Sequence, residues 1–242
     1  DGDFEAVSEI ARRSKNAVVC GLARAADGDI DRCWEAIRHA RQPRIHTFIG
    51  TSPLHRDITK LTQDEMVDRI AETVSRARNH CDNVQWSPMD ATRTEHDYLC
   101  RVVEAAIKSG ATTINIPDTV GYTAPRESAD LIAMLIDKVP GADEIVFATH
   151  CHNDLGMATA NSLAAVEAAG LLERLARLPA PLRLYAVAIG ADANLDLLEA
   201  LTRGGGLALR VEERAAAADA ALDPAAQHIS PAFSFVRANL ST

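Results

Sequence analysis

Residues 144–156 read EIVFATHCHNDLG, a short apolar run that ends in a cluster of polar side chains. The apolar part has the length and the β-branched content of a strand. Its polar end places His150 and His152 two residues apart, and side chains at positions i and i+2 of a strand point to the same face. The stretch therefore predicts a strand that brings two imidazoles to one side of its carboxyl end.

The same pattern, a short strand followed by an amphipathic helix, repeats along the first 170 residues. A βα unit that recurs every thirty residues or so is typical of a parallel sheet with helices between the strands. The expected strands lie near Ala17–Gly21, Arg44–Ile49, Asn83–Ser87, Thr112–Ile116 and Glu144–Thr149.

Two of the expected helices carry the Thr-x-x-Glu sequence of a capping box, in which the two side chains bond free N–H groups of the first turn. One helix covers Thr62–His80, with Glu65 as the second capping residue, and the next is expected to start with Thr92 and Glu95. Glycines just past the last apolar position mark helix ends. These are Gly110, Gly141 and Gly170.

Polar residues follow each of several expected strands. This pattern helps to choose between the two architectures that parallel strands with crossover helices can form, a closed barrel and an open sheet. A TIM barrel gathers all its strand ends at one mouth, whereas an open sheet binds ligands mainly at one switch point. The sequence therefore favours the α/β fold of a (β/α) TIM-barrel type. The polar groups are His46-Thr47, Ser87 to Asp90, Asp118-Thr119 and His150 to Asp154.

The character of the chain changes near residue 171, so we expect a partial barrel over 1–170 and a different segment over 171–242. In the second part, strands at Leu184–Ile189 and Leu207–Val211 flank a helix at Asn194–Thr202, a βαβ-like pattern of different origin. Five strands before residue 171 and two after it leave an eight-stranded barrel incomplete.

Composition excludes several classes of function. A net charge of −9 argues against nucleic-acid binding, which needs clustered basic residues. No apolar run is long enough to cross a membrane, and the opening Asp1-Gly2-Asp3 is no signal peptide. Because it also lacks an initiator Met, the chain is expected either to begin inside a longer protein or to have been cut or joined artificially. Five scattered cysteines favour free thiols and a cytoplasmic location.

Each polar group also has a simpler interpretation. An isolated His-x-His pair can merely line a strand end, although oxygen-rich neighbours favour a divalent metal ion. Asp118 and Gly121 suit a turn, and a lone His46 is more often structural than catalytic. The loop from Ser87 to Arg93 holds either helix-capping residues or groups that orient a small carboxylate ligand.

Three stretches together resemble the 2-isopropylmalate synthase family: HTFIGTSPLHR (46–56), SPMDATRTEHDYLCRVVEAAIKSGATTINIPDTVGY (87–122) and THCHNDLGMATANSLAAVEA (149–168). The resemblance implies an acyltransferase of leucine biosynthesis that condenses acetyl-CoA with 2-oxoisovalerate. It also implies a divalent metal, which could be Mn, Mg or Zn. Homocitrate and citramalate synthases are related alternatives. The expected partners are the two small-molecule substrates, and a homo-oligomer is left open.

The resemblance also implies roles for individual residues. His150 and His152 would be metal ligands, Ser87 and Thr119 would bind the 2-oxo acid, and His46 would be a catalytic residue of the same pocket.

Several family features are replaced or absent. The first-strand Arg-Asp-Gly motif is missing, Leu171 onward differs from the family's Asn-bearing segment, and Met89 stands where many members have an acidic residue. The leucine-sensing domain is missing too, and residues 183–210 weakly resemble the end of a von Willebrand A-type domain. We therefore expect little condensation by this chain alone, and the alternative is a catalytically silent scaffold or binding module.

Overall fold

The computed structural model describes residues 2–168, 185–189 and 207–211. Within the first range, five parallel strands form one sheet in which each strand pairs with the strand before it in the sequence. This confirms the expected α/β fold of an incomplete TIM-barrel type, with every strand end displaced by one to three residues from the expected position. The strands are β1 Val19–Arg24, β2 Pro43–Gly50, β3 Val84–Met89, β4 Thr113–Asp118 and β5 Val146–Cys151.

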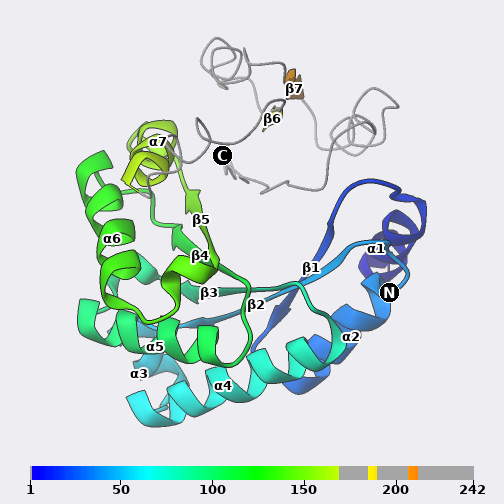
Figure 1. Cartoon of the computed structure of the whole chain (residues 1–242), viewed down its shortest axis with the longest axis horizontal. Coiled ribbons are helices and arrows are strands. Elements are labelled where there is room, and N and C mark those ends of the chain that lie inside the picture. The colour runs from blue at the N-terminus through cyan, green and yellow to red at the C-terminus, as the bar shows by residue number, and fades with distance from the viewer. Residues whose placement is uncertain (1, 169–184, 190–206, 212–242) are drawn as a thin grey trace.

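Helices alternate with these strands and cover the convex side of the curved sheet (Figure 1). Two helices that the sequence pattern does not predict are also present, α1 before β1 and α3 directly after β2. The helices are α1 Gly2–Arg13, α2 Asp27–Ile37, α3 Pro53–Thr59, α4 Gln63–His80, α5 His96–Lys108, α6 Pro125–Lys138 and α7 Ala158–Ala168, with short 3-10 turns η1 Ala91–Arg93 and η2 Ala142–Glu144.

The first capping box is confirmed. The backbone N–H of Thr62 donates to Glu65 Oε2 at 2.8 Å, and the N–H of Glu65 donates back to Thr62 Oγ1 at 3.3 Å. The expected helix ends at Gly110 and Gly141 are confirmed as well, since both glycines have the positive φ that suits a residue following a helix. Gly170 lies outside the described residues.

The second capping box is wrong. Residues Ala91–Arg93 form η1, and α5 begins only at His96, with Glu95 as an N-cap that makes no side-chain capping bond. The reason is the left-handed backbone of Asp90, with φ of 67°. Its carbonyl oxygen accepts the backbone N–H of Arg93 and the hydroxyl of Thr94, so the chain completes a tight turn before the helix starts.

The hydrophobic core lies between the convex face of the sheet and the helices. Trp86 of β3 is fully buried there, together with Ile70 of α4 and Leu99 of α5. Because side chains alternate along a strand, every second residue points to the opposite, concave face. On that face, Leu22, His46 and Gln85 stand opposite one another in the register, and Asn115 and Ala148, then His150, lie further toward the carboxyl ends of the strands.

A separate pair of parallel strands, β6 Tyr185–Ile189 and β7 Leu207–Val211, confirms the two strands expected in the C-terminal part. The helix expected at Asn194–Thr202 and the domain boundary near residue 171 lie outside the described residues. Within the described part of the chain, every helix is too short or too polar to cross a membrane.

Candidate active site on the concave face

Side chains from three neighbouring strands meet in the middle of the concave face. His46 Nε2 of β2 lies 2.7 Å from the hydroxyl oxygen of Ser87 on β3. Asn115 of β4 donates its amide N–H to the same oxygen at 2.9 Å. Ser87 and Asn115 are both buried. Two of the residues that the sequence assigned to a pocket, His46 and Ser87, therefore touch each other.

The cluster continues toward the amino ends of the strands. The Nη1 atom of Arg44 donates to Gln85 Oε1 at 3.2 Å, and its Nε donates to Asn83 Oδ1 at 2.8 Å. The amide nitrogen of Gln85 lies 3.3 Å from His46 Nδ1. Sequence reasoning missed the roles of Arg44, Gln85 and Asn115. The signal that could have found them is their spacing, since each stands two residues from another polar side chain on its strand.

His46 is uncharged at neutral pH. Burial, the positive charge of Arg44 and the neighbouring His150 together lower the pKa of its imidazole to about 4. A neutral ring carries one proton on one nitrogen and accepts at the other. His46 can therefore hold or pass a proton at Nε2, where it meets Ser87.

His150 and His152 lie at the end of β5 with their rings stacked, 5.0 Å between centroids and 23° between planes. The shared face expected from their spacing is thus present in the structure. The Nε2 atom of His152 is buried and has no hydrogen-bond partner in the described part of the chain. An orphaned imidazole nitrogen beside a second imidazole suits a metal ion.

The rest of a metal coordination shell is not supplied by the residues that the structure describes. Among them, no three His, Cys, Asp or Glu side chains gather closely enough to hold an ion. Structural zinc sites have four protein ligands and catalytic ones usually three. The two histidines therefore fit a metal as one part of its ligand set.

The turn after β4 confirms the simpler interpretation of Asp118. Its carboxylate accepts the backbone N–H groups of Gly121 and Thr123, each at 3.1 Å, and Gly121 has a φ of 71°. Thr119 is exposed. Thr119 begins the loop after β4, next to the two histidines that are candidate metal ligands. The backbone N–H of His152 donates to the carbonyl oxygen of Asp118, the residue before Thr119, at 3.0 Å.

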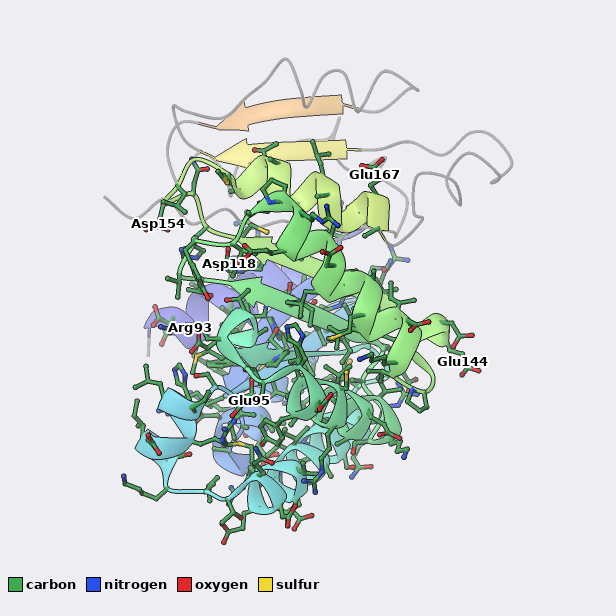
Figure 2. All side chains as sticks on the ribbon, turned by 90° about the vertical axis from the view of Figure 1, so that its left-hand side faces the viewer. Arg93, Glu95, Asp118, Glu144, Asp154 and Glu167 are labelled. Carbon is green, nitrogen blue, oxygen red and sulfur yellow. The ribbon has the colours of Figure 1, made fainter. Side chains whose placement is uncertain are left out.

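The loop after β3 holds a second group of charges at the carboxyl ends of the strands. Arg93 Nε donates to the buried Asp90 at 2.7 Å, and His55 Nδ1 lies 3.4 Å from the other carboxylate oxygen. Burial raises the pKa of Asp90, but bonds from Arg93 and Ser52 and the nearby positive charges lower it on balance. Figure 2 shows Arg93, Asp118 and Asp154 at one end of the sheet, with Glu144 at the other.

A parallel sheet with helices on its convex side, and polar groups gathered on its concave side and at its carboxyl ends, defines an incomplete TIM barrel of enzyme type. The chain belongs to the HMGL-like family, whose model matches residues 1–172.

Curated relatives are named 2-isopropylmalate synthase. The protein from Rhodopirellula baltica is 60% identical over 174 residues, which are 71% of this chain and 33% of that protein. The one from a Bradyrhizobium species is 61% identical over 170 residues, 69% of this chain and 32% of the relative. The chain thus spans about a third of the length of these relatives.

Solved structures share the fold at low sequence identity. A hydroxymethylglutaryl-CoA lyase from Pseudomonas aeruginosa has a TM-score of 0.56 and 18% identity, over 68% of this chain and 54% of the lyase. The carboxyl transferase domain of Rhizobium etli pyruvate carboxylase, with pyruvate and biocytin, has a TM-score of 0.51 and 16% identity, over 68% of this chain and 28% of that one. These likenesses concern the arrangement of strands and helices.

Proposed function

We propose that this chain carries the 2-oxo acid site and part of the metal site of a 2-isopropylmalate synthase, which condenses acetyl-CoA with 2-oxoisovalerate. The observation that carries the proposal is the gathering of His46 and Ser87 on the concave face of a domain about 60% identical to such synthases. The stacked His150 and His152 extend that face at the carboxyl end of β5.

Each residue has a defined task in this proposal. Ser87 and Thr119 bind the oxygens of the 2-oxo acid, and the neutral His46 holds a proton at the hydroxyl of Ser87. His150 and His152 would hold a divalent ion of Mn, Mg or Zn. Such an ion, when bound, supplies a Lewis acid for the keto oxygen. Ser87 and Asn115 are themselves buried, which keeps most water away from the hydroxyl of Ser87 and strengthens its hydrogen bonds.

The proposed location is the cytoplasm. All five cysteines are free thiols, and two of them, Cys81 and Cys151, are buried. Free thiols are usual in a reducing compartment.

A second candidate, from another class, is a catalytically silent scaffold or binding module. Two observations favour it. The described residues supply no third side-chain metal ligand, and Met89 stands where many members of the resembled family have an acidic residue. A half-complete metal shell binds an ion weakly, because each lost anionic ligand removes attraction.

Thiol release from acetyl-CoA in the presence of 2-oxoisovalerate and Mn²⁺ or Mg²⁺ separates the two candidates. The test compares the chain with His150→Ala/His152→Ala, and with His39→Ala/His96→Ala as a control that removes two exposed histidines. Release by the chain and the control, and none by the first variant, supports the synthase. If none of the three releases thiol, the silent module is the better description.

A further inference from the structure

Two loops at the carboxyl ends of the strands are tied to each other by backbone hydrogen bonds. One loop joins β4 to α6 and carries Thr119, and the other joins β5 to α7 and begins at His152. The N–H of His152 donates to the carbonyl oxygen of Asp118 at 3.0 Å, and the N–H of Leu155 donates to that of Gly121 at 3.3 Å. The candidate substrate loop and the candidate metal-binding segment therefore lie side by side.

A third bond between these segments comes from a side chain of α7. The amide Nδ2 of Asn161 donates to the backbone carbonyl oxygen of Thr123 at 2.6 Å. A carbonyl oxygen can only accept, so the nitrogen end of the amide is the end that faces it. The backbone carbonyl of Asn161 accepts the hydroxyl of Ser128 at 3.2 Å. Asn161 thus joins α7 to the loop and to the first turn of α6, the neighbouring helix in Figure 1.

Asn161 is an unfavourable residue for this position unless the bond matters. Its exposed fraction is only 1%, and burial of an amide costs free energy that a hydrogen bond must offset. Asparagine is also a poor helix former. Its Oδ1 is buried and has no hydrogen-bond partner among the described residues. The bond from Nδ2 to Thr123 is therefore what this side chain contributes.

The same loop is also held from its own start. The carboxylate of Asp118 accepts the N–H groups of Gly121 and Thr123, each at 3.1 Å. Thr123 is thus held at both of its backbone polar groups, by Asp118 at the N–H and by Asn161 at the carbonyl. Thr119 lies between these fixed points, so they restrict where its hydroxyl can be.

We infer that Asn161 is a positioning residue, which ties the loop that carries Thr119 to the segment that carries His152, so that the two open and close as one unit. It needs to touch neither a ligand nor an ion, because it acts through the backbone of Thr123. That this unit serves a 2-oxo acid and a metal ion rests on the proposed function. The coupling of the two loops does not.

Asn161→Leu tests the coupling, because leucine has a similar size but no donor for the carbonyl of Thr123. The matched control is Thr123→Val. It removes, from the same place, a buried hydroxyl that has no partner in the described part of the chain, and it keeps the backbone carbonyl that Asn161 binds. Hydrogen exchange of the backbone amides in the full chain, followed by NMR, reports how often each loop opens.

In Asn161→Leu, we expect the amides of both loops to exchange about tenfold faster, the usual effect of losing one hydrogen bond. The amides of the central strand β3 should keep their rates, and Thr123→Val should match the unaltered chain throughout. The reporting amides are Gly121 and Thr123 in one loop, and His152 and Leu155 in the other.

Three results would overturn the inference: unchanged exchange in Asn161→Leu, faster exchange in the first loop alone, or equally faster exchange throughout the sheet. The last result would indicate a loss of global stability. Asn161→Ala, whose small side chain suits a helix, gives the same test if leucine prevents folding.

Calorimetric titrations with Mn²⁺ and with 2-oxoisovalerate test the function of the unit separately. Both should bind several-fold more weakly to Asn161→Leu than to the unaltered chain, and equally well to Thr123→Val. Unchanged binding by Asn161→Leu would overturn the positioning role. If the exchange rates change as expected and the unaltered chain binds neither probe, the coupling of the loops stands and the proposed function fails.

Discussion

Gly21 lies on the convex side of β1, directly against α2. A Cβ atom there would overlap Cys33 Sγ and come within 3.1 Å of Ile37 Cγ2. We expect Gly21→Ala to lower the free energy of unfolding by about 1–3 kcal/mol, the usual cost of overpacking a core. Urea denaturation measures it. The cost should shrink in a Cys33→Ala background, where the overlapping sulfur is gone, and an equal cost in both backgrounds would contradict this explanation.

The neutral state of the half-buried His46 makes stability depend on pH. Its folded pKa of about 4 lies below the unfolded value near 6.5, so only the unfolded chain binds the proton between these values. The contribution is fully present above pH 6.5 and is lost as the pH falls toward 4, by roughly 3 kcal/mol in all. Between pH 7 and pH 4, the urea midpoint of the chain should fall further than that of His46→Gln. An equal fall in both proteins would show that folding does not lower the pKa of this ring.

At the scale of elements, the capping box of α4 offers a test of local structure. Thr62→Ala removes the side-chain acceptor for the N–H of Glu65 and should destabilise the protein by about 1 kcal/mol. The control is Thr59→Ala in α3, whose exposed hydroxyl bonds only carbonyl groups of its own helix. Thermal denaturation of both variants checks the prediction, which fails if they lose the same stability.

The sequence predicts each βα unit well because the strands and helices have different apolar periods. It is less accurate at the boundaries. The Thr92 capping box was expected from spacing alone, yet the left-handed Asp90 and its bonds to the next turn delay the helix to His96. Strand β5 starts at Val146, two residues later than expected, since Ala142–Glu144 forms a 3-10 turn ahead of it. Such turns depend on single backbone angles that periodicity does not contain.

The site was predictable only in part for a related reason. The spacing of His150 and His152 determines their common face, because both belong to one strand. The contacts of His46 with Ser87 and of Ser87 with Asn115 cross between strands. They depend on the register of three strands, which is set by the packing of whole helices. Family resemblance indicated His46 and Ser87. The two-residue spacing of Arg44, Gln85 and Asn115 from other polar side chains indicates their face of the sheet, but their contacts are seen only in the three-dimensional structure.

At the scale of the whole molecule, a bound ion should stabilise the folded state. An ion at about one hundred times its dissociation constant adds about 2.7 kcal/mol to the free energy of unfolding, provided that it binds only the folded chain. We expect Mn²⁺ to raise the melting temperature of the chain and of His39→Ala/His96→Ala, but not that of His150→Ala/His152→Ala. An equal rise in all three proteins would place the ion elsewhere.

The strand order of the main sheet repeats the order of the sequence, β1 to β5, without a crossover to a distant strand. Each new strand therefore finds its partner in the strand made just before it, across a loop of a few dozen residues or fewer. Loop closure over such distances costs less entropy than the pairing of strands that are far apart in the sequence. During synthesis, when chains leave the ribosome amino end first, this sheet can add one strand at a time to an edge already formed. Within this sheet, β5 and its two histidines are the last to join the concave face.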